Sequence, residues 1–227
     1  MLKLYIGNKN YSSWSMRPWV LLKQAGSGFE EVMVKFDDMA EDSAFKAQMR
    51  KIAPTVRVPV LVDGGLVVWD SLAIAEYVAD LHPAKNLWPA HVQDRARARA
   101  LCAEMHSGFA ALRNAFGMNI EASLQHIGQI ALRDQPAVRA DLQRIVDMWS
   151  LQLQQHGNRL LFGDFSIADA YFAPVCMRIR TYALPVPVAI SAYVDRVCAL
   201  PGVKAWIDAA LQEKDFVVFD EPYRAQR

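Results

Sequence analysis

The sequence predicts an α/β N-terminal half followed by an all-helical C-terminal half. Short β-rich runs alternate with helical stretches up to residue 82, and strand patterns nearly vanish beyond residue 91. The segment between them, residues 83–91, contains Pro83 and Pro89 and has no clear periodicity, which is typical of a linker. A chain of 227 residues is long enough for two modest domains. We therefore expect domains at residues 1–82 and 92–227.

The N-terminal half has the pattern β-α-β-α-β-β-α. Apolar residues alternate along its first two expected strands, as they do where one face of a strand is buried. The strand–helix–strand start favours a parallel pair, whereas Asp63-Gly64-Gly65 predicts a tight turn between two antiparallel strands. The expected strands cover 2–6, 31–36, 58–62 and 66–69, and the expected helices cover 15–25, 42–52 and 71–81.

The C-terminal half carries apolar residues at helical spacing. The two longest stripes comprise Leu101, Met105, Phe109, Leu112 and Phe116, and then Val138, Leu142, Ile145, Trp149 and Leu153. Three more helices are expected near 166–178, 188–200 and 201–212. This half is therefore expected to form a helical bundle.

Charge and composition exclude several classes of function. The 25 basic and 24 acidic residues nearly cancel, so no broad attraction to nucleic acid or to an anionic membrane is expected. We find no segment suited to spanning a membrane and no signal peptide, and we expect a cytoplasmic protein. The three dispersed cysteines and unpaired histidines indicate neither a disulfide framework nor a metal site.

Serines crowd the N-terminus of the first expected helix, in the stretch Tyr11-Ser12-Ser13-Trp14-Ser15. Backbone amides at a helix N-terminus favour negative charge, and such a position lowers the pKa of a thiol. A serine hydroxyl can donate a hydrogen bond to a thiolate, although it is no base at neutral pH. Lowering a thiol pKa by two units needs only about 2.7 kcal/mol. The alternative is that these serines merely cap the helix.

Val58-Pro59 opens the third expected strand. Proline lacks an amide hydrogen and therefore suits the start of a strand in the ordinary trans form. In a cis peptide, the Val58 backbone would turn outward and dock an extended ligand. Only about 5–6% of X–Pro bonds are cis, so these residues alone favour the trans form.

Two further helix starts carry an acid and a hydroxyl. Ser71 is a natural N-cap where the fourth strand becomes a helix. Free amides there could instead hold a carboxylate while Asp70 holds an ammonium group, and a ligand with an amino-acid end would satisfy both. Ser166 and Asp169 have capping-box spacing, which we interpret as a folding signal rather than as an active site.

In order and spacing these motifs resemble the cytosolic glutathione S-transferases, and the resemblance covers essentially the whole chain. It rests on the serine-rich loop, on Val58-Pro59, on Asp70-Ser71 and on the box at Ser166 and Asp169. It implies a thioredoxin-like N-terminal domain and a cis peptide before Pro59. The loop is similar to the zeta-like pattern Ser-Ser-Cys-Ser-x-Arg, with Trp14 in place of the cysteine. That substitution points to a bacterial serine-type enzyme outside the well-defined classes.

By this resemblance, Ser12 is the catalytic serine and Ser13 is a neighbouring glutathione contact. Glutathione would lie extended along the first domain, and an electrophile would lie between the two domains. The other candidate glutathione contacts are Arg57, Val58 and Pro59, with Asp70 and Ser71 at the γ-glutamyl end. The candidate pocket for the electrophile comprises Trp14, Met105, His106, Phe109 and Phe116, with helix core as the alternative reading of the last four. Weaker candidates are Arg17 and Arg57, for helix anchoring or carboxylate steering, and Arg178 and Arg180 for an acidic substrate.

The implied reaction is attack of the glutathione thiolate on a small hydrophobic electrophile, carried out by a homodimer without a metal. One rival is a glutathione-dependent isomerase similar to maleylacetoacetate isomerase, or a reductive dehalogenase. The other rival binds glutathione or an apolar ligand without turnover. Trp14 argues against a cysteine-based lyase or disulfide reductase, and it weakens the case for the isomerase. A second departure is Val56, which stands where the family often has glycine.

Overall fold

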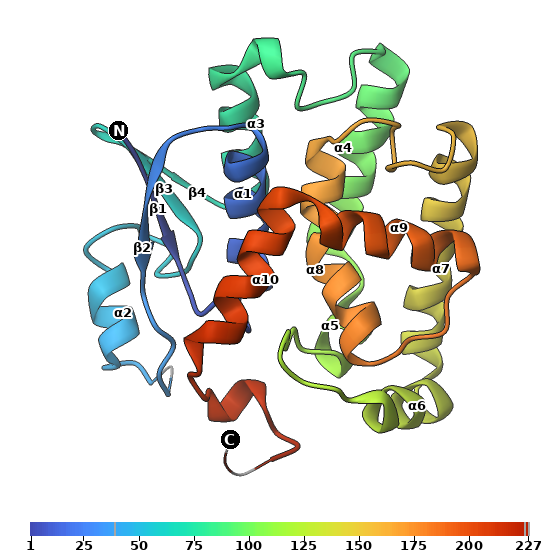
Figure 1. Cartoon of the computed structure of the whole chain (residues 1–227). Helices are drawn as coiled ribbons and strands as arrows, with labels where there is room; N and C mark the ends of the chain where they lie inside the picture. The colour runs from blue at the N-terminus through green and yellow to red at the C-terminus, as the bar shows by residue number, and fades with distance from the viewer. Residues whose placement is uncertain (39, 225, 227) are drawn as a thin grey trace.

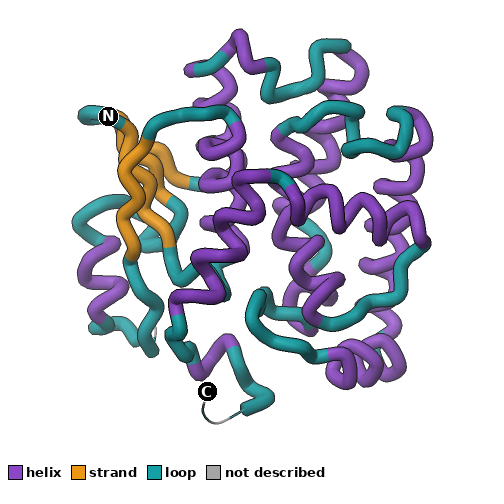
Figure 2. Tube along the Cα trace, in the orientation of Figure 1, coloured by secondary structure: helices purple, strands orange, loops and turns teal. Residues whose placement is uncertain are grey.

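The chain folds into an α/β half and an all-helical half that lie side by side (Figure 1). The computed structural model describes residues 1–38, 40–224 and 226. The first half has the thioredoxin-like order β-α-β-α-β-β-α that the sequence predicts, and Figure 2 shows its strands gathered at one side of the molecule. Its elements are β1 (Leu2–Ile6), α1 (Ser13–Gln24), β2 (Phe29–Met33), α2 (Ala44–Met49), β3 (Val60–Asp63), β4 (Leu66–Trp69) and α3 (Ser71–Leu81).

The sheet has the strand order β2-β1-β3-β4 and mixes both kinds of pairing. β1 and β2 are parallel, whereas β3 is antiparallel to both β1 and β4. The predicted turn joins β3 to β4 through Gly64, whose φ of +57° glycine adopts at no steric cost. β2 lies at 29–33 rather than at the predicted 31–36, because the partner strand β1 ends at Ile6, opposite Met33.

The two faces of the sheet are buried against different helices. Leu4 and Leu61 belong to the main core, which includes the buried sides of α1 and α3. Tyr5 and Val60 point to the opposite face, where they pack in a smaller cluster with Phe45 of α2. Successive residues thus face opposite sides of the sheet, which is the period-two pattern of the sequence.

Serine caps set the bounds of two helices in this half. Ser43 Oγ accepts a hydrogen bond from the Lys46 amide at 3.2 Å, so α2 begins at Ala44 rather than at the predicted residue 42. α1 begins at Ser13, two residues before the predicted start, because Ser12 is its N-cap. The serine-rich loop is therefore the start of a helix, and its side chains are fixed by that helix.

The C-terminal half is all helical, as predicted. Its elements are α4 (Val92–Ser107), α5 (Ala110–Ala115), α6 (Gln125–Asp134), α7 (Pro136–Gln155), α8 (Ile167–Thr181), α9 (Val188–Ala199) and α10 (Pro201–Glu213), with single turns η1 (Pro83–Lys85) and η2 (Val218–Asp220). α8 is buried along nearly its whole length and packs against α1 and α4. The main core therefore runs from one half into the other. The domain boundaries at residues 82 and 92 stay predictions.

The first long apolar stripe of this half belongs to two helices rather than one. α4 ends at Ser107, and Phe109 adopts a φ of +56° before α5 begins. A Cβ atom on Gly108 would lie 2.8 Å from the carbonyl oxygen of Glu104, so this exit from α4 requires glycine. The break turns the second part of the stripe in a new direction.

α6 has no counterpart in the sequence prediction. Gly128 lies inside this helix of 10 residues and weakens its helical pattern. A Cβ atom on Gly128 would lie 2.3 Å from the carbonyl oxygen of Tyr182, so glycine lets α6 approach the end of α8. The glycine that the packing of these two helices requires also lowers the local helix propensity, and for this reason α6 was not predicted.

The predicted capping box at the start of α8 is confirmed. The Ser166 amide donates to Asp169 Oδ2 at 2.9 Å. The Leu161 amide and the Tyr193 hydroxyl donate to Asp169 Oδ1, both at 3.1 Å. Burial raises the pKa of Asp169 to about 6. This carboxyl group ties α8 to the preceding loop and to α9, which fits the folding role that the sequence indicates.

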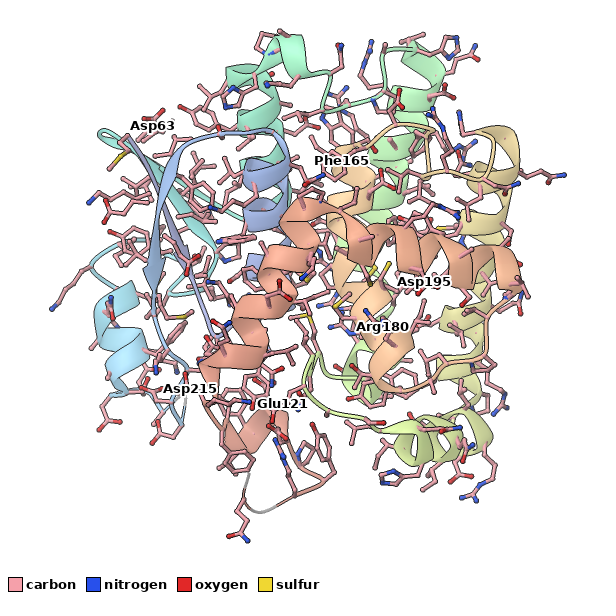
Figure 3. The ribbon with its side chains drawn as sticks, viewed as in Figure 1. Asp63, Glu121, Phe165, Arg180, Asp195 and Asp215 are labelled. Carbon is pink, nitrogen blue, oxygen red and sulfur yellow. The ribbon has the colours of Figure 1, made fainter. Side chains whose placement is uncertain are left out.

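The C-terminal segment, residues 214–224, returns from α10 toward the N-terminal half (Figure 1). Asp215, labelled in Figure 3, lies just beyond α10, and its Oδ2 accepts a hydrogen bond from Asn8 Nδ2 at 2.8 Å. The Tyr11 hydroxyl donates to the backbone oxygen of Asp215 at 3.1 Å and to the carboxylate of Glu221. The segment is thus fastened beside the start of α1.

Two kinds of feature are absent from the described residues. None of their helices is long and apolar enough to cross a membrane. No three of their His, Cys, Asp and Glu side chains are placed to hold a metal ion.

Candidate active site

Two neighbouring cavities lie between the α/β half and the helical half. The first has a volume of about 390 Å³ and is lined by Ser12 and Ser13 at the start of α1; we call it the serine cavity. The second has a volume of about 350 Å³ and is lined by Pro59; we call it the cis-proline cavity. Both cavities are bordered by Trp14, Arg57, Val58 and Arg113. One extended ligand can therefore occupy both.

Ser12 combines a capping role with a place in the wall of the serine cavity. Its Oγ accepts a hydrogen bond from the Ser15 amide at 3.4 Å and donates one to Ser15 Oγ at 2.7 Å. Ser15 Oγ in turn accepts from the Gly7 amide at 3.1 Å. The capping contacts that the sequence offered as an alternative are thus present. The same side chain stands at the positive end of the α1 dipole, where negative charge is favoured.

Trp14 lies in the wall of both cavities, beside two guanidinium groups and one imidazole ring. The guanidinium carbons of Arg17 and Arg113 lie 4.0 Å and 4.7 Å from the centre of its indole ring. The ring of His106 meets the indole edge-on, with the ring centres 5.3 Å apart. Aromatic faces attract cations, so this tryptophan holds positive charge at the site where a zeta-like loop has cysteine.

Arg17 is buried behind Trp14 and lines neither cavity. Its Nε donates to the backbone oxygen of Tyr171 at 2.9 Å, and its Nη1 has no hydrogen-bond partner among the described residues. Burial lowers its pKa to about 10, so the guanidinium stays protonated at neutral pH. The contact with α8 fits the anchoring role expected for this residue, and it leaves a buried positive charge close to the start of α1.

The other residues that the resemblance assigns to glutathione binding line the cis-proline cavity. The peptide between Val58 and Pro59 is cis, as the resemblance implies. Arg57, Asp70 and Ser71 line the same cavity. The loop before it adopts a φ of +51° at Val56, a conformation that favours glycine. The chain therefore keeps a glycine-like backbone at the position where its sequence departs from the family.

The N-cap of α3 is Asp70, so the prediction that Ser71 caps this helix is wrong. Asp70 Oδ1 accepts hydrogen bonds from the amides of Leu72 at 2.8 Å and Ala73 at 3.3 Å. Ser71 is the first residue of α3, and its Oγ lies 3.1 Å from the hydroxyl oxygen of Tyr171. Asp70 stands just before the helix with a φ of +77°, and its carboxylate takes the free amides, whereas the Ser71 hydroxyl is engaged with Tyr171.

His106 joins these two residues from the helical half. Its Nε2 lies 3.1 Å from Asp70 Oδ2, and its Nδ1 lies 2.7 Å from the Tyr171 hydroxyl oxygen. A chain of polar contacts therefore runs from Asp70 through His106 and Tyr171 to Ser71. His106 was expected in the electrophile pocket, but it lines the cis-proline cavity. Tyr171 was missed, because its position in α8 resembles helix core.

Three residues expected around the electrophile line neither cavity. Met105, Phe109 and Phe116 are 0%, 6% and 0% exposed and belong to the main core. Their burial in the core agrees with the alternative reading of an apolar helical stripe. Arg180 lines a separate hollow of about 240 Å³ beside α10.

The outer wall of the serine cavity comes from α5 and the loop after it, from α8 and from the C-terminal segment. Its members there include Arg113, Asn114, Met118, Arg178, Phe219 and Asp220. Arg178 Nε donates to the backbone oxygen of Phe116 at 2.7 Å, and burial lowers the pKa of this guanidinium to about 9. Burial also raises the pKa of Tyr11 to about 12, and its hydroxyl is engaged by the C-terminal segment. Tyr11 is therefore a neutral wall residue rather than a base.

Comparison with known proteins agrees with this geometry. The family model described as the N-terminal domain of glutathione S-transferase matches residues 11–81, and the model of its C-terminal domain matches residues 95–209. The chain belongs to the glutathione S-transferase family.

The named relatives include a zeta-class glutathione S-transferase and maleylacetoacetate isomerases. The chain is 30% identical over 176 residues to a zeta-class glutathione S-transferase of Euphorbia esula, across 76% of this chain and 73% of that protein. It is 33% identical over 111 residues to a probable maleylacetoacetate isomerase of Caenorhabditis elegans, a match that spans 49% of either protein. A glutathione transferase homologue from Burkholderia, solved with bound glutathione, has a TM-score of 0.68 at 27% identity and covers 94% of this chain and 99% of its own.

Proposed function

We propose that this chain is a serine-type glutathione transferase that joins the glutathione sulfur to a small electrophile. The observation that carries the proposal is the wall that the two cavities share, formed by Trp14, Arg57, Val58 and Arg113. A glutathione molecule with its γ-glutamyl end at Asp70 and Ser71, and its cysteinyl part along Val58, would bring its sulfur toward Ser12. The electrophile would occupy the rest of the serine cavity.

Three features of this chain would favour the thiolate over the thiol. The Ser12 hydroxyl can donate to sulfur in place of its bond to Ser15. The first turn of α1 presents backbone amides and the positive end of a helix dipole. The guanidinium groups of Arg17 and Arg113 flank Trp14 beside the same helix start. Preorganised donors of this kind stabilise charge without reorganisation, and holding both reactants together adds the benefit of proximity.

Binding and turnover can be tested separately. Titration calorimetry with glutathione should give a single saturable site, and conjugation to a dinitrophenyl chloride should be faster with enzyme than without. Saturable binding without turnover would favour the rival that only binds glutathione. Absence of binding would contradict the proposal altogether.

A second candidate is isomerisation of an unsaturated acid, in which glutathione adds to a cis double bond and is then released. Three guanidinium groups, those of Arg57, Arg113 and Arg178, line the serine cavity and suit a carboxylate substrate. Relatives that carry the name maleylacetoacetate isomerase point the same way. The test is to follow a cis-unsaturated diacid by absorbance and to measure glutathione at the end. Conversion with full recovery of free glutathione supports the isomerase, and loss of glutathione supports conjugation.

We also propose that the protein acts as a cytoplasmic homodimer. The edge strand β4 leaves Leu66 48% exposed, which is apolar surface that a second copy would cover. Light scattering after size-exclusion chromatography should give twice the mass of 25.5 kDa. A monomer would contradict this part of the proposal.

A further inference from the structure

Asp220 stands out among the acidic residues of the C-terminal segment. It lines the serine cavity together with Ser12, and it also lines an adjoining cavity of about 500 Å³ beside Tyr182 and Tyr223. A ligand that fills the serine cavity therefore meets a carboxyl group on the wall contributed by the end of the chain.

The position of Asp220 is fixed by its neighbours. Asp215 accepts from Asn8, and Tyr11 donates to Glu221, so the segment is fastened to the α/β half on either side of Asp220. Its own turn is closed by hydrogen bonds from the Asp220 amide to Val217 O at 3.0 Å and from the Glu221 amide to Val218 O at 3.2 Å. The turn is thus part of the cavity wall.

The three carboxyl groups of this stretch differ in their partners. Asp215 pairs with Asn8 and with Lys35, and Glu221 pairs with Tyr11 and Arg224. The Asp220 carboxyl, in contrast, has no hydrogen bond or ion pair to any residue in the described part of the chain. The one carboxyl group of the three that lines the serine cavity is therefore the one left available to a ligand.

The chemistry of electrophiles determines what such a group can do. When a thiolate displaces chloride from an aromatic ring, the C–S bond forms, the C–Cl bond breaks, and chloride leaves without needing a proton. When a thiolate adds to a double bond conjugated to a carbonyl, the C–S bond forms and the π electrons move onto the α carbon and oxygen. That enolate must take up a proton before the product is stable, and a positioned acid speeds this step.

We propose that Asp220 is a catalytic acid that donates this proton, and that carbonyl-conjugated alkenes are the preferred electrophiles of this chain. The inference rests on the proposed transferase function and names its substrate class. The thiol proton of glutathione leaves to solvent when the thiolate forms. Asp220 gives its proton to the α carbon of the adduct and is reprotonated from solvent, so the reaction needs no further reactant.

The charges around Asp220 support this role. Burial raises its pKa to about 6, the Glu221 carboxylate acts in the same direction, and Arg178 opposes both. The other ionisable groups that line its two cavities are Tyr11, Arg57, Arg113, Tyr182 and Tyr223. Asp220 therefore keeps its proton to a higher pH than an exposed aspartate. With the thiolate already formed, addition should slow as pH rises through about 6, whereas displacement of chloride should not.

The test compares Asp220→Asn with wild type on two electrophiles, an aryl-substituted enone and a dinitrophenyl chloride. We expect kcat/KM for addition to the enone to fall about a hundredfold, at least tenfold more than kcat/KM for chloride displacement. Asp220→Glu should restore part of the addition rate. Val218→Ala, in the same turn and 67% exposed, is the matched control and should behave as wild type on both substrates.

The outcomes separate this inference from the proposed function. Equal losses on both substrates, or no loss on either, would overturn the role of Asp220 while leaving the transferase in place. Wild-type turnover of the aryl chloride but not of the enone would overturn both the role of Asp220 and the substrate class, while leaving the transferase in place. No turnover of either electrophile would overturn both proposals. Glutathione affinity and the melting temperature of each variant show whether the cavity wall has kept its structure.

Discussion

The cis-proline cavity and the serine cavity are built in different ways. Most of the wall of the cis-proline cavity comes from two short stretches, residues 55–59 and 69–71. The wall of the serine cavity is scattered along the chain from Tyr11 to Asp220. The contrast teaches that a site for a shared cosubstrate can be held by local motifs, whereas the site for the variable reactant is assembled by tertiary structure.

The largest effect is expected from replacing Ser12, and it should fall on turnover rather than on glutathione affinity. Ser12→Ala should lower turnover by about tenfold to a thousandfold, because a donor to the thiolate is lost. Glutathione affinity should be largely spared, since its γ-glutamyl contacts lie in the other cavity. Steady-state kinetics and calorimetry on the same preparation measure both quantities. Ser13→Ala is the matched control, and an equal loss there would show that Ser12 has no special role.

Replacing Asp70 should have the opposite effect, because it should weaken glutathione binding rather than the chemical step. Asp70→Asn keeps an oxygen for capping the Leu72 amide but removes the charge that would hold the glutathione ammonium group. We expect KM for glutathione to rise about tenfold to a hundredfold, because a charged hydrogen bond contributes about 1.5–3 kcal/mol. Asp70→Ala also removes the cap and should lower the melting temperature further. A normal KM in Asp70→Asn would remove Asp70 from the binding site.

His106 should have a smaller effect of the same kind, because it acts through Asp70 and Tyr171. His106→Ala removes the contact of 3.1 Å to Asp70 and should raise KM for glutathione about threefold to tenfold, with kcat little changed. Tyr171→Phe, which removes only the hydroxyl partner, should raise KM less. A fall in kcat at unchanged KM would mean that His106 serves the chemistry instead and would break the comparison between the cavities.

The smallest effect on activity is expected from a change that touches neither cavity. Ser166→Ala weakens the start of α8 and should cost about 0.5–2 kcal/mol of the free energy of unfolding. Turnover per folded molecule should match that of wild type at a temperature well below melting. Denaturant unfolding measures the free energy of unfolding, and steady-state kinetics measure turnover. A large loss of turnover would show that the start of α8 affects the active site as well as stability.

The sequence predicted the parts of the molecule whose signals are local. Alternating apolar residues and a Gly-Gly turn indicated the sheet, and the spacing of Ser166 and Asp169 indicated the start of α8. The resemblance supplied the cis peptide before Pro59. These features depend on neighbours in the chain, so a single sequence contains them.

Other parts depend on contacts between distant segments and were missed. The stripe through Phe109 looked continuous, but a positive φ there divides it between α4 and α5, and the residues of the stripe that were expected in the pocket lie in the core. Tyr171 resembled helix core, and nothing in its spacing reveals the contact with His106. The C-terminal segment has no periodicity, so no pattern placed Phe219 and Asp220 in the wall of the serine cavity.

The central claim is that this chain binds glutathione at the start of α1 and holds it as a thiolate. The direct measurement is the pKa of the bound thiol, obtained from thiolate absorbance against pH on wild type and on Ser12→Ala. We expect a value well below that of the free thiol in wild type, and a shift back toward the free value when Ser12 is replaced. Bound glutathione with the pKa of the free thiol would contradict the account.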